Sequence, residues 1–145
     1  MTADGSARRL GVVADGGSRG NPGIAAGGSA VIDLATGEVL AEIGEYVGVS
    51  TNNVAEYRGM IEGVRAALAI DPTAELTVRL DSRLVVEQMS GRWKIKHPEM
   101  AKLATEAREL LAGVPVVFEW VPREQNKLAD RLANESMDAR ASFRR

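Results

Sequence analysis

The stretch Leu10–Gly23, LGVVADGGSRGNPG, decides how the rest of the chain is interpreted. Its first residues are apolar and rich in valine, which is typical of a half-buried strand. The strand leads into Asp15, and a segment of glycine, asparagine and proline residues follows, which favours a turn. The acid is then either a cap for its own hairpin turn or a functional group at a strand end. The choice depends on whether further acids occupy similar positions.

Composition limits the classes of protein to consider. The 145 residues, 45% hydrophobic and 26% charged, fit one globular domain with its own core. The lack of cysteine excludes disulfides and thiolate metal sites, and it favours a cytoplasmic location. No apolar run approaches the ~20 residues that span a bilayer, and the N-terminus lacks the apolar segment of a secretory signal. The net charge is −2, so any binding of nucleic acid must depend on local patches.

Apolar periodicity and turn signals predict the element order βββαβααβα. The first three strands have connections too short for a parallel crossover, so we expect an antiparallel meander. The paired glycines of the second strand either admit another backbone closely or introduce a bulge. The order as a whole predicts a mixed sheet with helices on its faces. The expected strands are Leu10–Asp15, Ala25–Leu34, Val39–Val47, Glu75–Leu80 and Val114–Val121, and the expected helices are Thr51–Ile70, Ser82–Met89, Pro98–Ala112 and Asn126–Ala139.

Four acids fall at comparable places in these elements. Asp15 and Asp81 each end a strand, where open α/β sheets bind ligands. Glu56 and Asp130 lie in the first turns of two helices, where each could simply complement the helix dipole. Four carboxylates that converge on one point repel one another strongly unless a cation is present. Mg²⁺ prefers such oxygen ligands together with water and phosphate oxygens.

Four motifs in this chain resemble ribonuclease HI, the family that cuts RNA in RNA–DNA hybrids. The motifs are DGGSRGNPG, TNNVAEYRG, LDSRLVVEQ and VPREQNKLADRLA. They occur in the same order as in the family, and the resemblance covers about Leu10–Met137. The resemblance implies a ribonuclease H-like α/β fold, with a five-stranded mixed sheet whose first three strands are antiparallel and with helices on both faces. We expect a flexible N-terminus at residues 1–9, the ribonuclease H domain at 10–139, and a basic tail at 140–145 that is interpreted as part of a linker.

The resemblance also implies the reaction and the roles of the acids. Asp15, Glu56, Asp81 and Asp130 match the catalytic carboxylates, which hold two Mg²⁺ ions, with Mn²⁺ as a substitute. By resemblance, Asp15 bridges both ions, Asp130 completes the ion that activates water, and Glu56 with Asp81 holds the ion near the leaving 3′ oxygen. Paired ions ~3.5–4 Å apart can stabilise the attacking and leaving oxygens together. The implied products carry a 5′-phosphate and a 3′-hydroxyl.

Contacts to the hybrid are also implied. Proteins use the ribose 2′-hydroxyl to tell RNA from DNA. Thr51 and Asn52 match positions that hold a phosphate of the DNA strand, although Thr51 is equally suited to a plain helix N-cap. The residues expected on the RNA side are Gly17, Ser18, Asn21 and Gln88, and Gly16 is also expected to bind the substrate.

The chain departs from the family pattern in two places. The long basic protrusion of many members is reduced to residues 91–98, GRWKIKHP, so we expect Trp93, Lys94 and Lys96 to contact the DNA backbone. The alternative is a solvated loop with Trp93 in the core. The loop before Asp130 also lacks the histidine found in many members. Arg123 is the catalytic candidate there, with Glu124 beside it, but arginine cannot serve as a general base.

The expected function is therefore endonucleolytic hydrolysis of the RNA strand of RNA–DNA hybrids by a monomeric enzyme. One alternative is a hybrid-binding module with weak or no catalysis, against which the intact set of four acids argues. Another is a different nuclease of the same fold. Sequences of this type also occur fused to a C-terminal phosphatase-like domain, so we expect such a domain in the full-length protein.

Overall fold

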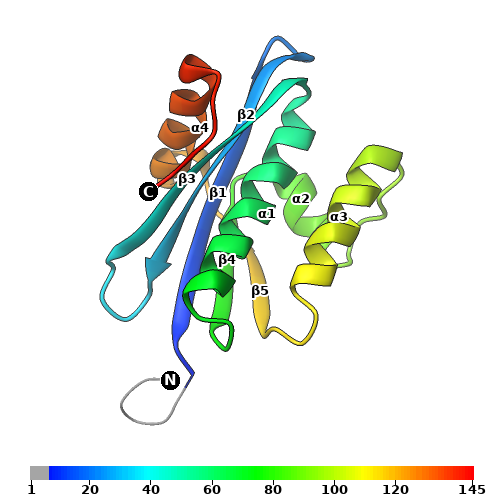
Figure 1. Ribbon diagram of the computed structural model, residues 1–145. Coiled ribbons are helices and arrows are strands. Elements are labelled where there is room, and N and C mark those ends of the chain that lie inside the picture. Colours follow the sequence, from blue (N-terminus) through cyan, green and yellow to red (C-terminus); the bar gives the residue numbers. More distant parts are fainter. Residues whose placement is uncertain (1–6) are drawn as a thin grey trace.

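The computed structural model describes residues 7–145, in which a central sheet is flanked by helices (Figure 1). Within this range the sheet has six strands in the order β5-β4-β1-β2-β3-β6. The strands are β1 (Arg9–Arg19), β2 (Gly23–Asp33), β3 (Val39–Ser50), β4 (Glu75–Leu80), β5 (Val116–Trp120) and β6 (Phe143–Arg144). The helices are α1 (Asn52–Ile70), α2 (Arg83–Met89), α3 (Pro98–Leu110) and α4 (Lys127–Ala139), with a single 3₁₀ turn, η1 (Arg123–Gln125), before α4.

The sheet is mixed, as the element order predicts. β1, β2 and β3 form the expected antiparallel meander. β4 pairs in parallel with β1, and β5 pairs in parallel with β4. Parallel pairing requires a long crossover, which α1 provides between β3 and β4, and which α2 and α3 provide between β4 and β5.

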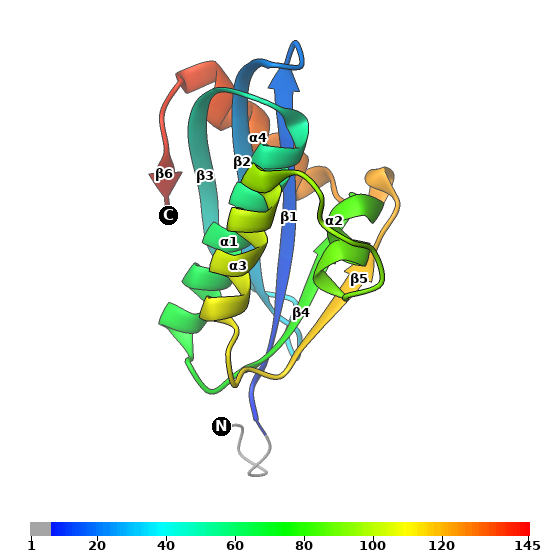
Figure 2. The same cartoon turned by 90° about the vertical axis from the view of Figure 1, so that its right-hand side faces the viewer.

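Helices cover both faces of the sheet, which confirms the fold prediction. α1 packs on one face with α3 beside it, and α4 packs on the opposite face over β1, β2 and β3 (Figures 1 and 2). The α1 side holds the larger core, and Tyr57, Ile61 and Val64 reach it at the helical spacing seen in the sequence. None of the helices in residues 7–145 combines the length and hydropathy that a membrane crossing requires.

Two side-chain caps fix where helices begin next to the sheet. The Thr51 Oγ1 accepts a hydrogen bond from the Val54 backbone N–H at 3.4 Å, at the start of α1. The Ser82 Oγ accepts one from the Val85 N–H at 3.2 Å, at the start of α2. A side-chain acceptor satisfies an N–H that has no partner inside the helix, so each helix starts at a defined residue.

The paired glycines of β2 allow both helical layers to approach the sheet closely. A Cβ on Gly27 would lie 2.4 Å from the backbone nitrogen of Gly59 in α1. A Cβ on Gly28 would lie 2.3 Å from the backbone nitrogen of Ala133 in α4. The predicted close approach is confirmed on both faces, and the pairing of β2 with β3 also shifts register between Ala25 and Ala26. The two layers therefore cross the sheet at neighbouring residues.

β1 is longer than the sequence indicates. The glycine-rich segment after Asp15 was expected to turn at once, but Gly16–Arg19 continue the strand and pair with β2 as far as Ile24. Glycine fits an extended strand where another backbone lies against it, so composition alone did not distinguish the two conformations. Asp15 thus lies within β1, although the parallel pairing of β1 with β4 ends just before it, at Ala14.

The last residues add a strand that the sequence did not predict. β6 pairs with β3 through Phe143–Gly44 and Arg144–Ile43, so the sheet has six strands instead of five. The segment 140–145 was expected to be a basic tail, yet Arg145 forms an ion pair with Glu135 at 2.7 Å. A two-residue strand has no periodicity from which it could be recognised.

Part of the expected flexible N-terminus is ordered against the sheet. The Arg8 guanidinium lies 3.1 Å from the Asp33 carboxylate, and β1 already begins at Arg9. The remainder of that prediction, residues 1–6, lies outside the described residues.

Candidate active site

Strand pairing brings Asp15 and Asp81 together. β1 and β4 run parallel and stay in register up to the pair Ala14–Leu80. Asp15 follows Ala14 and Asp81 follows Leu80, so the two acids come directly after the last paired residues of these strands. β4 ends there and α2 begins after Ser82, which leaves the edge open beside the two carboxyl groups.

A close contact between α1 and β1 places Glu56. A Cβ on Gly16 would lie 2.2 Å from the backbone nitrogen of Glu56. Only glycine allows this separation, because a side chain at that point would overlap the helix backbone. Glu56 is therefore held directly beside the residue that follows Asp15.

A buried asparagine places Asp130 from the opposite face. Asn126 is 2% exposed, and its Nδ2 donates to the backbone oxygen of Ala14 at 2.8 Å. The backbone oxygen of Asn126 in turn accepts from the Asp130 N–H at 3.1 Å. The first turn of α4 is thus tied to β1 one residue before Asp15.

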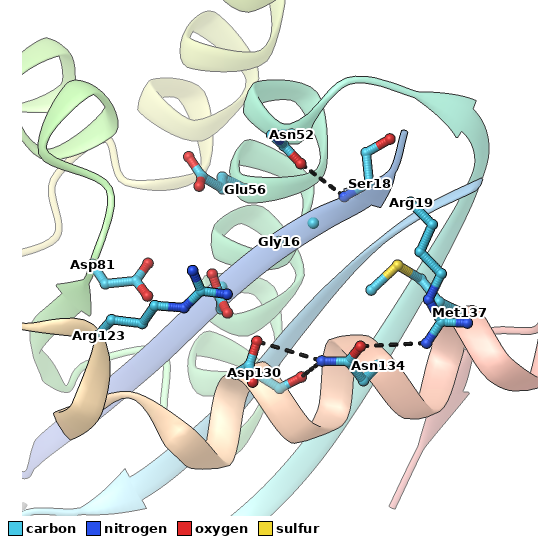
Figure 3. A pocket seen from close by; sticks show the side chains of 12 residues that line it. Gly16, Ser18, Arg19, Asn52, Glu56, Asp81, Arg123, Asp130, Asn134 and Met137 are labelled. Atoms are coloured by element: carbon cyan, nitrogen blue, oxygen red, sulfur yellow. Dashed lines mark hydrogen bonds between the residues drawn. The ribbon is translucent and has the colours of Figure 1, made fainter. Parts of the chain in front are cut away.

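The four predicted carboxylates share one cleft of about 410 Å³ (Figure 3). Oxygens of Asp15, Glu56 and Asp81 lie within 4.8 Å of one another, and Asp130 lines the same cleft outside this close group. The residues that line the cleft are Asp15, Gly16, Gly17, Ser18, Arg19, Asn52, Glu56, Asp81, Arg123, Asp130, Asn134 and Met137.

Burial and the charge of neighbouring acids raise the pKa of Asp15 and Glu56, so these two groups retain protons. Burial raises the pKa of Asp15 to about 8, and the neighbouring Asp81 and Asp130 add to this effect. Burial also raises the pKa of Glu56 to about 7, with a further contribution from Asp81. A hydrogen bond from Ser82 and the charge of Arg123 act in the opposite direction on Glu56. The cleft therefore favours any cation that can replace those protons.

The donor set fits a hard divalent cation. All the clustered ligand atoms are carboxylate oxygens, and the cleft is open on one side for water or phosphate oxygens. In the part of the chain that the structure describes, the cluster of Asp15, Glu56 and Asp81 is the group of acids with metal-ligand spacing. This matches the sequence-based prediction for three of its four residues, and Asp130 lines the same space.

The glycine-rich end of β1 is joined to the start of α1 by polar contacts. The Ser18 backbone N–H donates to Asn52 Oδ1 at 2.8 Å, and the Asn52 N–H donates to Asn21 Oδ1 at 3.1 Å. Gly16, Gly17, Ser18 and Asn52 line the cleft, whereas Asn21 is exposed and does not line it, and their contacts with a hybrid stay predictions. The Thr51 side chain caps α1, a role compatible with phosphate binding, and its contact with the DNA strand stays a prediction.

Arg123 lies in the cleft, and Glu124 does not line it. η1 presents the Arg123 side chain among the acids, where its charge lowers the pKa of Glu56 (Figure 3). Glu124 follows it in the same turn but is exposed. The loop that lacks a histidine therefore still supplies one cation to the site.

Gln88 is a wrong prediction. It is 3% exposed, and its Oε1 accepts a hydrogen bond from the Tyr57 hydroxyl at 2.6 Å. Its backbone oxygen accepts a hydrogen bond from the Arg108 guanidinium, so both the side-chain and the backbone oxygen bond to other residues of the protein. Gln88 lies near the end of α2, on the helix face that packs into the core, and it cannot reach a nucleic acid in the cleft.

The basic loop before α3 lies apart from the carboxylates. Trp93 is 47% exposed, which rules out the alternative that it packs in the core, and Lys94 and Lys96 are also exposed. The loop is anchored by Arg92, whose guanidinium contacts Glu87 at 2.5 and 2.9 Å. None of these three predicted contact residues lines the acidic cleft, so their role in binding stays a prediction.

Three cleft residues were not predicted: Arg19, Asn134 and Met137. Asn134 and Met137 follow Asp130 by four and seven residues in α4, so helical spacing places them on one face. The sequence alone could therefore have predicted that these two residues lie beside Asp130. Arg19 could not be found in this way, because the segment that carries it was expected to form a turn.

Comparison with known proteins gives consistent matches. Residues 14–136 match the family model described as reverse transcriptase-like. The bifunctional protein Rv2228c of Mycobacterium tuberculosis is 53% identical over 131 residues, which are 90% of this chain but 36% of that protein. The chain therefore spans about a third of the length of this curated relative. The solved N-terminal RNase H domain of Rv2228c has a TM-score of 0.87 at 50% identity, with 92% of this chain and 96% of that chain covered.

Two further structures extend the likeness beyond mycobacteria. RNase H1 of the archaeon Halobacterium salinarum has a TM-score of 0.85 at 39% identity, over 90% of this chain and 98% of that chain. LC11-RNase H1, solved in complex with an RNA/DNA hybrid, has a TM-score of 0.85 at 35% identity with the same coverage. With the acidic cleft at the end of β4, these matches show that the chain belongs to the ribonuclease H family.

Proposed function

We propose that this chain is an endonuclease that hydrolyses the RNA strand of RNA–DNA hybrids with Mg²⁺, or with Mn²⁺ as a substitute. The observation that carries the proposal is the open cleft that Asp15, Glu56, Asp81 and Asp130 line together. Support also comes from the relative LC11-RNase H1, which was solved with such a hybrid.

The arrangement of the acids suits two divalent cations. When bound, two such ions supply the positive charge that stabilises the attacking and leaving oxygens of phosphodiester hydrolysis. Asp81 affects the pKa of both Asp15 and Glu56, whereas Asp130 affects that of Asp15. By the family resemblance, Asp15 is the carboxylate that would contact both ions.

The remaining cleft residues suit a phosphate and a ribose. The extended backbone of Gly16 and Gly17, which carries no side chains, lines the cleft, and Asn52 lines it as well. Groups placed to meet ribose 2′-hydroxyls would be left unpaired by a DNA strand, which discriminates against it. Arg123 can stabilise the charge that develops on the scissile phosphate.

The two rival functions fit these observations less well. A module that only binds the hybrid gains nothing from buried acids whose pKa values are raised, because clustered negative charge opposes binding of a polyanion. The motifs DGGSRGNPG and TNN, which supply the hydrogen-bonded Ser18 and Asn52 beside the acids, favour the hybrid over the substrate of another nuclease of the same fold. We further propose that the domain acts as a monomer in the cytoplasm and is fused to a C-terminal phosphatase-like domain. The 36% coverage of the bifunctional protein Rv2228c supports the presence of a further domain.

The proposal is tested by an assay of labelled RNA–DNA, RNA–RNA and DNA–DNA duplexes. We expect cleavage of the RNA in the hybrid alone, with 5′-phosphate and 3′-hydroxyl ends. Cleavage should stop in EDTA and return when Mg²⁺ or Mn²⁺ is added. Activity that survives exhaustive chelation, or comparable cutting of the all-DNA duplex, would contradict the proposal.

A further inference from the structure

A chain of polar side chains connects the end of β1 to the fourth carboxylate. The Asn134 Nδ2 lies 3.4 Å from Asp130 Oδ1 and 2.9 Å from the Asp130 backbone oxygen. The Asn134 Oδ1 accepts a hydrogen bond from the Arg19 guanidinium at 3.3 Å (Figure 3). Arg19 also forms an ion pair with Asp138, one turn further along α4, at 2.6 Å. All three residues of the chain Arg19–Asn134–Asp130 line the cleft.

The chemistry of the two neighbours fixes the orientation of the Asn134 amide. An ionised carboxylate only accepts hydrogen bonds, and a guanidinium only donates them. The amide has a donor end and an acceptor end, so only one of its two orientations satisfies Asp130 and Arg19 together. Asparagine suits this position because it bridges an acceptor and a donor without adding a charge to the acidic cleft.

Asp130 is the carboxylate that most needs such support. The other three acids lie within 4.8 Å of one another, whereas Asp130 projects from α4 on the other face of the sheet and is partly exposed. A partly exposed aspartate has several accessible rotamers, and some of them move the Asp130 carboxylate away from the cluster. A hydrogen bond from Asn134 restricts those rotamers.

We infer that Asn134 is a positioning residue that holds the Asp130 carboxylate beside Asp15, and that Arg19 acts through Asn134 by fixing its amide. The inference rests on the proposed function, since it assigns both residues a role toward the metal ions of that site. Residues that orient metal ligands typically contribute about 10–100-fold to metal affinity or activity. The contact of Asn134 with Asp130 is long and partly exposed, so we expect the lower end of that range.

The experiment compares the full chain with Asn134→Ala, Arg19→Met and the double variant. Mn²⁺ binding is measured by calorimetry without nucleic acid, and turnover of the hybrid is measured against Mg²⁺ concentration. For Asn134→Ala we expect Mn²⁺ binding about 10-fold weaker, a matching rise in the Mg²⁺ concentration for half-maximal turnover, and a KM for the hybrid within about twofold. Arg19→Met should show a smaller effect, and the double variant should equal Asn134→Ala, because two residues that act through one contact are not additive.

The matched control is Asp138→Asn, which removes the exposed ion pair of Arg19 but leaves its contact with Asn134. Exposed ion pairs contribute little, so Mn²⁺ binding should be unchanged. If the wild type binds Mn²⁺ and Asn134→Ala binds it equally well, or if the effects of Arg19→Met and Asn134→Ala simply add, the inference is overturned. If the wild type binds no Mn²⁺, the proposed function itself fails. Thermal unfolding in EDTA shows whether Asn134→Ala is folded. If it is not, the Mn²⁺ affinity of Arg19→Met tests the inference instead.

Discussion

Asp15 is 8% exposed and lies next to two other carboxylates, so its charged form is disfavoured in the folded chain. Its pKa rises from 3.8 to about 8. Between these values the folded state binds a proton that the unfolded state has released. The unfolding free energy of the metal-free protein must therefore fall as pH rises through this range.

Asp15→Asn should stabilise the metal-free protein while it abolishes turnover. The amide carries no charge, so the loss of stability on raising the pH from 6 to 8.5 should become smaller. Thermal unfolding in EDTA at both pH values measures this. Asp33→Asn is the control: a backbone hydrogen bond and Arg8 lower the pKa of Asp33 below its usual 3.8, so this substitution should destabilise the protein about equally at both pH values. An Asp15→Asn protein that is no more stable than wild type at pH 8.5 would contradict the prediction.

Arg123→Ala should lower turnover more than it weakens metal binding. The guanidinium lies among the carboxylates and can stabilise charge on the scissile phosphate, an effect worth on the order of 10²-fold when the contact forms in the transition state. Single-turnover and steady-state rates measure it. Glu124→Ala, in the same turn but outside the cleft, should change these rates little. Unchanged rates for Arg123→Ala would mean that the carboxylates and their ions suffice.

At the scale of elements, the position of α4 depends on a single buried side chain. Asn126 joins the start of α4 to the backbone of β1, and its amide lies in the interior. Asn126→Ala would remove this buried hydrogen bond to the Ala14 carbonyl, a loss of about 1–3 kcal/mol. Urea unfolding measures the change in unfolding free energy. Lys127→Ala, exposed at the next position, should cost much less; equal effects would show that the anchor is unimportant.

The sequence was informative about elements whose residues have a strong local pattern. β4 was predicted with its observed bounds, and the four acids were found because motifs mark their positions. Gln88 was misplaced because a motif match does not show which side of α2 faces the core. Arg19 and β6 were missed because each depends on contacts with residues far along the chain, namely Asn134 and Gly44. Local sequence carries no signal for such contacts.

At the scale of the whole molecule, the helical layers on the two faces meet the sheet at Gly27 and Gly28. A Cβ on Gly28 would overlap backbone atoms of α4, which cannot move as a flexible side chain can. We expect Gly28→Ala to lower the unfolding free energy by about 1–3 kcal/mol, as overpacking does. Gly17→Ala is the matched control, since its Cβ would meet the Met137 side chain at an ordinary 3.6 Å. Urea unfolding of both variants measures the difference, and equal stability would show that the layers can separate at no cost.

β6 also affects how one molecule meets another. An unpaired strand edge offers N–H and C=O groups to a second chain and promotes aggregation. Here the Glu42 N–H donates to the Arg145 carbonyl and the Tyr46 N–H donates to the Ser142 Oγ, so part of the β3 edge is occupied from within. Removal of residues 142–145 should expose that edge and cause concentration-dependent self-association, detectable by light scattering and sedimentation. Arg140→Ala, which leaves β6 in place, should remain dispersed, and a truncated chain that stays dispersed at every concentration would show that β6 has no such protective role.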